Sequence, residues 1–267
     1  MNGGNTSPGH TAHHGVPANG GSIKSRRELE LMREAGQIVA LAVEKSFASL
    51  EPGITTRELD DIARREIESH GAKPAFLGLY GFPATACISI NEEIVHGIPG
   101  GRVVNDGDLV SIDCGAIVGG MYSDHARTAV AGTSTPEKDR LVKVTMESLA
   151  KGIEQIRAGN RIGDVSHAVE SHVLSHGFDL VREYVGHGVG RELHEPPQVP
   201  NFGPAGKGPL MRVGMVLAVE PMVNVGTWKT RTLDDDWTVV TEDGELSAHF
   251  EHTIAVTPDG AEILTVL

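Results

Sequence analysis

The sequence predicts an α+β fold made of two similar halves, each with helices followed by strands. The main observation is an internal repeat: residues 52–71 (PGITTRELDDIARREIESHG) align without gaps with residues 158–177 (AGNRIGDVSHAVESHVLSHG). Both segments read as a helix that stops at Ser-His-Gly. Strand-like segments then lead to histidine motifs, HGIP at 96–99 and HEPP at 194–197. A site between such halves would draw residues from both, although the few identities leave chance similarity open.

The first two helices are predicted from their start and stop signals. Ser25 and Glu28 have the spacing of a capping box at the start of the first helix. Thr55 or Thr56 is the expected N-cap of the second helix, which ends at His70-Gly71. In the first helix, five residues can share one apolar face: Leu29, Met32, Ile38, Leu41 and Ala42.

The later elements alternate between helix and strand. Apolar residues at helical spacing predict helices at about 137–157 and 162–175. Strands are expected at 84–95, 108–131, 179–185, 215–224, 237–241 and 247–257.

Residues 1–22 have a different composition from the rest of the chain. They are rich in Gly, Asn, Ser, Thr and Pro and poor in large apolar residues, so they cannot bury enough surface to offset the entropy of ordering. We therefore expect a disordered tail at 1–22 and one catalytic domain at 23–267. His10, His13 and His14 could bind stray metal, but they are interpreted as incidental residues of the tail.

The composition excludes several classes of function. The net charge is −13, and the only basic run is KSRR at 24–27, so no nucleic-acid partner is expected. No apolar run approaches the length of a membrane span, and the N-terminus lacks the apolar region of a secretory signal. The two cysteines, Cys87 and Cys114, lie beside apolar residues and suit a reducing cytoplasm.

Two aspartates on one predicted hairpin indicate a metal site. Asp113 and Asp124 are separated by Gly119-Gly120, and folding the hairpin near residues 118–119 places the two aspartates opposite each other. Their Cβ atoms would then be roughly 4.5–5.5 Å apart. Both carboxylates could reach two ions about 3.5–4 Å apart, as in known two-metal sites. The alternative is that Asp113 caps a turn and Asp124 pairs with Arg127.

Three further residues have the setting of metal ligands. His187 lies in a glycine-rich loop, whereas Glu220 and Glu251 occur in apolar strands, where an unpaired charge is costly. Ion pairs with arginine are the alternative for the two glutamates. Four carboxylates at one point would repel one another unless divalent cations compensated them. An oxygen-rich set with one histidine suits Mn, Fe, Co or Zn.

These motifs resemble those of the bacterial type I methionine aminopeptidases over nearly the whole chain, from about Ser25 to Leu267. The resemblance implies the pita-bread fold, in which two pseudo-symmetric α+β halves surround a curved antiparallel sheet. Only 32 residues separate His187 from Glu220, so the insertion of type II enzymes is absent. The segments that carry the resemblance are CISINEEIVHGIP, VSIDCGA, SDHARTAVAG, GHGVGRELHEPPQVP, VLAVEPMVN and SAHFEHTIAV.

The resemblance also assigns roles to individual residues. It implies that His96 and His194 contact the substrate and that Glu220 moves a proton. Phe76 and Leu79 depart from the residues of some bacterial members, which leaves the details of the methionine pocket open. The implied ligands of the two divalent ions are Asp113, Asp124, His187, Glu220 and Glu251. The implied apolar pocket comprises Phe82, Cys87, Leu193 and Trp237.

The implied activity is removal of the N-terminal methionine from nascent proteins and peptides when the second residue is small. In this mechanism a metal-bridged hydroxide attacks the peptide carbonyl. The expected enzyme is a cytoplasmic monomer that acts on protein N-termini, with the ribosome as a further partner.

Two alternatives remain. A prolidase or aminopeptidase P would share the ligands, but those enzymes usually carry an additional N-terminal domain, for which 267 residues leave no room. A non-catalytic pita-bread protein would bind partners in its cleft, but such proteins generally lose ligands.

Overall fold

The computed structural model describes residues 20–267, so most of the predicted tail, residues 1–19, lies outside the described residues. Four long helices and fifteen strands make up the described part. The helices are α1 (Arg26–Ala48), α2 (Thr56–Ser69), α3 (Pro136–Ile153) and α4 (Ile162–Ser175), with a short 3-10 helix at Leu79–Gly81.

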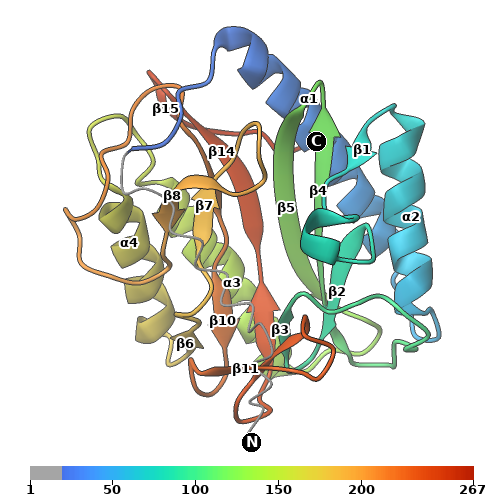
Figure 1. The fold of residues 1–267 in the computed structure, drawn as a ribbon. Helices are drawn as coiled ribbons and strands as arrows, with labels where there is room; N and C mark the ends of the chain where they lie inside the picture. Colours follow the sequence, from blue (N-terminus) through green and yellow to red (C-terminus); the bar gives the residue numbers. More distant parts are fainter. Residues whose placement is uncertain (1–19) are drawn as a thin grey trace, which may run out of the picture.

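A large antiparallel sheet curves through the centre of the molecule (Figure 1). Its strands follow the order β1-β4-β5-β14-β9-β7-β8, with β2 paired to β4 and β15 paired to β14. The bounds are β1 (Lys73–Pro74), β2 (Ala86–Ile90), β4 (Leu109–Val118), β5 (Met121–Val130), β7 (Gly186–Gly188), β8 (Glu195–Val199), β9 (Val216–Val219), β14 (Glu251–Thr257) and β15 (Gly260–Ile263).

Two three-stranded sheets extend the large one. One has the order β13-β10-β6 and the other β11-β12-β3. Their bounds are β3 (Glu93–Val95), β6 (Asp179–Leu180), β10 (Met222–Asn224), β11 (Thr230–Thr232), β12 (Val239–Thr241) and β13 (Ser247–His249).

The helices begin where their local signals predict. Ser25 and Glu28 form a reciprocal capping box at α1, and Thr55 and Glu58 form another at α2. Each box satisfies backbone N–H groups that the first turn of a helix leaves without partners. Thr135 caps α3 and accepts a hydrogen bond from the backbone of Lys138.

The two halves each have their own apolar core, as the internal repeat predicts. α1 and α2 pack against β2, β4 and β5 in the first half, whereas α3 and α4 lie against β8, β9, β10 and β13 in the second. α2 and α4, the two repeated helices, lie at the right and left of the molecule in Figure 1, with the strands of the large sheet between them. Two further clusters contain residues of both halves, one with Met32 and Val216 and the other with Leu109 and Val173, so the halves are also packed against each other.

The hairpin of β4 and β5 has a different register from the predicted one. Val118 pairs with Met121 across a two-residue turn at Gly119-Gly120, and both glycines have positive φ. Asp113 is therefore opposite Ala126 and not Asp124, so that prediction was wrong. The fold axis runs between the two glycines, one residue beyond the predicted midpoint. The pairing partner of Asp113 is therefore shifted by two residues. Since side chains alternate between the two faces of a sheet, a shift by two keeps both aspartates on the same face.

Two predicted strands are interrupted at residues of interest. The segment 215–224 divides at Glu220-Pro221 into β9 and β10, and the segment 247–257 divides at Phe250 into β13 and β14. After β9 the chain passes from the large sheet into β10 of a small sheet, and after β13 it passes from that small sheet into β14 of the large one. Glu220 and Glu251 therefore lie where the two sheets meet. The segment 84–95 likewise divides into β2 and β3, with Asn91 at a positive φ between them.

The last two residues of the predicted tail, Gly21 and Ser22, contact the domain, so the tail is predicted two residues too long. Gly21 is buried, and an added Cβ atom would lie 2.6 Å from the carbonyl oxygen of Pro196. The Ser22 hydroxyl donates to Glu195 at 2.5 Å, and the Lys24 ammonium donates to the same carboxylate at 2.7 Å. These contacts attach the start of the described chain to the HEPP turn.

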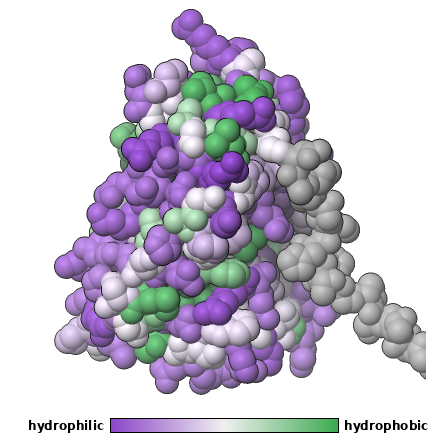
Figure 2. Space-filling model, turned by 90° about the vertical axis from the view of Figure 1, so that its left-hand side faces the viewer, coloured by the Kyte–Doolittle hydropathy of each residue, from purple (hydrophilic) through white to green (hydrophobic). Residues whose placement is uncertain are grey.

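The surface on the α4 side is mostly hydrophilic, with small apolar groups scattered over it (Figure 2). Within residues 20–267, no helix has the length and apolar character needed to cross a membrane.

Candidate metal centre and active site

Four strands of the large sheet each carry one of the predicted metal ligands, and a fifth ends directly before another. In sheet order, β4 carries Asp113, β5 carries Asp124, β14 begins with Glu251, β9 ends before Glu220, and β7 contains His187. Ligand atoms of Asp124, His187 and Glu251 all lie within 4.8 Å of one another. His187 Nε2 is 3.5 Å from a Glu220 oxygen, and, in addition to burial, the charge of Asp113 raises the pKa values of Asp124, Glu220 and Glu251, so its carboxyl group lies near all three. The structure thus brings all five side chains together.

The four carboxyl groups of this centre have raised pKa values. Burial is the largest cause at each one, and it raises the pKa of Asp113 to about 7. The pKa values of Asp124, Glu220 and Glu251 are raised well above their usual range, because neighbouring carboxylates add repulsion to burial. One buried oxygen each of Asp113, Asp124 and Glu251 has no hydrogen-bond partner. Divalent cations would bind these unpaired oxygens and reduce the repulsion between the neighbouring carboxylates. The residues therefore fit the predicted metals.

The imidazole of His187 is oriented as a ligand. Its Nδ1–H donates to the carbonyl oxygen of Gly188 at 3.0 Å, which leaves the lone pair of Nε2 directed at the carboxylates. Burial lowers the pKa of His187 to about 3, so the ring is neutral at pH 7. A neutral imidazole is the form that binds a metal.

The other two predicted histidines border the same centre. The ring of His194 lies 4.4 Å from that of His187, edge to face, and stacks on Tyr80 at 6.1 Å. The ring of His96 contacts Trp237, with centroids 6.4 Å apart. Burial lowers the pKa of both histidines, to about 4 for His96, so both are neutral hydrogen-bonding groups at pH 7.

The predicted pocket residues form one apolar cluster beside the carboxylates. Cys87 on β2 is paired directly with Asp113 on β4, which joins the cluster to the metal centre. Phe82 and Trp237 meet edge to face at 5.1 Å. The four predicted residues of this cluster are Phe82, Cys87, Leu193 and Trp237, and they pack with Ala75, Phe76, Ala84, Leu79, Ile98, Ile117 and Tyr122.

Two residues of the centre were missed in the sequence. His249 is buried, its Nε2 lies 3.9 Å from a Glu220 oxygen, and that nitrogen has no hydrogen-bond partner. Its position two residues before Glu251 was the available signal. Tyr80, which stacks on His194, lies in the left-handed region at φ 52°. No pattern in the sequence pairs residues 80 and 194, because the contact depends on how the halves fold together.

We expect the metal-free protein to lose stability as the pH rises above about 7. The folded state retains protons on its buried carboxyl groups, whose pKa values are raised, whereas the unfolded state has already released them. The free energy of unfolding therefore falls as the pH rises toward the pKa values that these carboxyl groups have in the folded state. Below about pH 7 the buried histidines, with lowered pKa values, oppose this trend because they gain protons on unfolding.

Thermal unfolding of the metal-free and manganese-loaded protein across this pH range measures the effect. The midpoint of the metal-free form should fall with pH more steeply than that of the loaded form. Asp124→Asn should flatten the metal-free curve. Parallel curves for the metal-free and loaded forms would contradict the assignment of these carboxyl groups.

The two-halved α+β fold and the carboxylate-rich centre of its sheet define a class of protein, the pita-bread metallopeptidases. The sequence matches metallopeptidase family M24 over residues 30–258, and the chain belongs to this family. It is therefore an enzyme of the metallopeptidase class, and the expectation of a pita-bread fold is confirmed.

Curated relatives and solved structures support the same placement. The chain is 51% identical over 245 residues to a methionine aminopeptidase of Clostridium perfringens, covering 92% of this chain and 98% of the relative. It is 53% identical to methionine aminopeptidase 1 of Bacillus subtilis, covering 91% and 98%. The crystal structure of methionine aminopeptidase from Thermotoga maritima superposes with a TM-score of 0.91 at 46% identity, covering 92% and 99%.

The prolidases share the fold at a greater distance. The prolidase of Pyrococcus horikoshii superposes with a TM-score of 0.74 at 25% identity, and the match covers 91% of this chain but only 63% of that one. The methionine aminopeptidases match over their whole length, so the alternative of a prolidase is less well supported.

Proposed function

We propose that this enzyme removes the N-terminal methionine from proteins and peptides and prefers a small second residue. The observation that carries the proposal is the convergence of Asp113, Asp124, His187, Glu220 and Glu251 on the large sheet, beside an apolar cluster. Relatives about 50% identical over nearly their full length are methionine aminopeptidases, which supports the substrate class. The proposed site of action is the cytoplasm, on nascent chains at the ribosome, as a monomer.

The same five side chains would hold two divalent cations. Once bound, the cations would activate a water molecule and polarise the scissile carbonyl group. The chain provides the rest of the site. Its buried acids hold negative charge close to the cations, and the His187 ring is fixed by its hydrogen bond to Gly188.

Glu220 is the best-placed proton carrier of this set. Its carboxyl group is 3.5 Å from His187 Nε2 and 3.9 Å from His249 Nε2, and burial raises its pKa, which suits a group that accepts and releases a proton. Its backbone carbonyl is fixed by the side-chain amide of Asn201 at 3.0 Å. Glu220 would take a proton from water and pass it to the departing amine.

The two neutral histidines would position the substrate. His194, beside His187, would donate a hydrogen bond to the carbonyl oxygen as negative charge develops there. His96, against Trp237, would hydrogen-bond the scissile amide nitrogen. The methionine side chain would enter the apolar cluster that Cys87 joins to Asp113.

Substrate choice tests the proposal. The backbone around His187 is tightly packed, since an added Cβ atom at Gly188 would lie 2.2 Å from the carbonyl oxygen of Pro196. A small second residue should fit beside this loop, whereas a long charged one would collide or lose its water. We expect kcat/KM for Met-Ala-Ser to exceed that for Met-Lys-Ser by about 10²-fold or more.

The assay includes X-Pro peptides and a chelator arm as controls. His194→Ala should slow every substrate and keep their ranking, because it removes transition-state stabilisation and not recognition of the second side chain. Comparable rates on Met-Ala-Ser and Met-Lys-Ser would contradict the proposed specificity. Preferred cleavage of X-Pro peptides would indicate a prolidase-type activity, and no cleavage with metal supplied would indicate a binding protein.

A further inference from the structure

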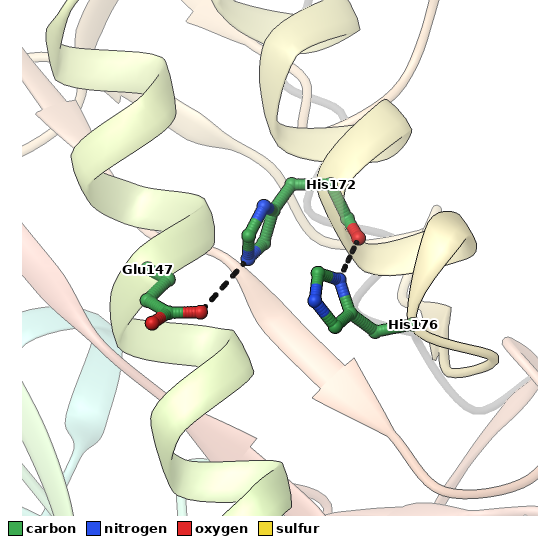
Figure 3. Close-up of side chains that lie close together, drawn as sticks. All are labelled: Glu147, His172 and His176. Carbon is green, nitrogen blue, oxygen red and sulfur yellow. Dashed lines mark hydrogen bonds and ion pairs between the residues drawn. The ribbon is translucent and has the colours of Figure 1, made fainter.

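A second group of metal-binding side chains lies between α3 and α4, outside the carboxylate centre (Figure 3). His172 is on α4 and His176 is its C-cap, so the two imidazoles are four residues apart and share one face of the helix. Glu147 projects toward them from α3, which packs along α4. One ligand atom from each of the three residues lies within 4.8 Å of the other two.

The ring nitrogens of this group are oriented for an ion. His176 Nδ1–H donates to the carbonyl oxygen of His172 at 2.8 Å, and its other nitrogen faces the side of Glu147 (Figure 3). His172 Nε2 is shielded from solvent and has no hydrogen-bond partner, although a Glu147 oxygen is 3.3 Å away. A hydrogen bond that fixes one imidazole nitrogen and frees the other is typical of metal-ligating histidines.

The spacing agrees with a tetrahedral ion. Zinc binds histidine nitrogens and carboxylate oxygens at about 2.0–2.2 Å, which separates neighbouring ligands by about 3.3–3.5 Å. The distance from His172 Nε2 to Glu147 Oε2 is 3.3 Å. The ammonium of Lys143 lies 3.9 Å from the other Glu147 oxygen, and its exposed side chain is free to move away from a cation.

The internal repeat supplies a natural comparison. Glu66 and His70 on α2 occupy the positions that His172 and His176 occupy on α4, 106 residues later in the chain. In the first half Glu66 pairs with His70 at 3.0 Å and with Lys45 of α1 at 2.5 Å. A lysine there already compensates the acid at 2.5 Å, whereas in the second half the acid lies beside two imidazoles and the ammonium of Lys143 is 3.9 Å away.

We propose that Glu147, His172 and His176 form a second, independent site for a zinc-like divalent cation that joins α3 to α4. Two imidazoles and one carboxylate are a zinc ligand set with a fourth position left for water. Cu²⁺ and Ni²⁺ would compete for such a site, whereas Mg²⁺ and Ca²⁺ prefer oxygen ligands. The bound ion would stabilise the half of the molecule whose helices support β8 and β9. This proposal does not depend on the proposed peptidase activity.

The test counts zinc bound to the full chain by equilibrium dialysis after removal of metal with a chelator. His10, His13 and His14 are replaced by alanine in every arm, so that tail histidines add no binding. The parent protein should bind one more Zn²⁺ per chain than His172→Gln. Glu147→Gln, which keeps the size of the side chain, should weaken this additional binding by at least about tenfold. Zinc should also raise the thermal midpoint of the parent more than that of either variant.

His70→Gln is the matched control, since it alters the equivalent position of the first half. It should leave the zinc count unchanged. Both active-site ions are present in every arm and cancel in the difference. Equal zinc counts and affinities in the parent and in the folded Glu147→Gln protein would overturn the proposal, as would an equal loss in His70→Gln. Should His172→Gln fail to fold, Glu147→Gln and His176→Gln decide the result.

Discussion

Replacing Glu220 by glutamine is expected to lower kcat on Met-Ala-Ser by about 10²-fold or more, the usual contribution of a general base. The amide keeps an oxygen that can face a cation, but it cannot accept a proton. It keeps the size of the residue between β9 and β10, so the fold should survive. Metal content measured on the same samples should therefore fall much less than turnover.

The comparison of metal content and turnover decides the role of Glu220. Full recovery of kcat when metal is added in excess would show that Glu220 serves as a ligand alone. His249→Gln is a useful companion variant, because His249 approaches the same carboxyl group from β13. A smaller loss is expected for it, since the proton carrier itself remains.

Asp124→Asn is expected to reduce activity to less than about a tenth of the wild-type value, even at saturating metal. Asp124 is buried, lies 4.0 Å from His187 Nε2, and has a ligand atom within 4.8 Å of those of His187 and Glu251. The asparagine removes a negative charge that the two cations require. Calorimetric titration with Mn²⁺ should show the loss of at least one bound ion per chain.

Arg127→Gln is the matched control for this variant. Arg127 is on the same strand and pairs with Glu44 on α1 at 2.5 Å, away from the carboxylates. It should keep both ions and near-normal activity. An Asp124→Asn protein that retained both ions and more than a tenth of the activity would remove Asp124 from the set of ligands.

Local signals predicted the starts of the helices but not the ends of all the strands. The capping residues Ser25 and Thr55 act within one turn of helix, so neighbouring residues are enough to locate them. The breaks at Glu220 and Phe250 depend on which sheet each segment joins, which is a tertiary property. The same holds for β7 and β8, whose Gly- and Pro-rich sequences have low strand propensity and are paired only because neighbours are present.

The residues of the site were easier to predict than the pairing of the strands that carry them. Asp113 and Glu251 were recognisable because a charged residue among apolar strand residues conflicts with its surroundings, and such conflicts mark functional positions. The residue opposite Asp113 could not be predicted, because an error of one residue in the position of the Gly119-Gly120 turn changes every pairing partner by two residues. The group at Glu147 was missed because it requires two helices to pack side by side, and no spacing in the sequence encodes that contact.

The position of β14 has a consequence for how the enzyme comes into existence. Although it is nearly the last strand in the chain, it lies between β5 and β9 in the middle of the large sheet. Contacts between such distant segments form late and slowly, because long loops must close first. A growing chain on the ribosome therefore has no complete centre until Glu251 has emerged, sixteen residues before Leu267. Under the proposed function, N-termini that appear while one molecule is being synthesised would be processed only by copies that were completed earlier.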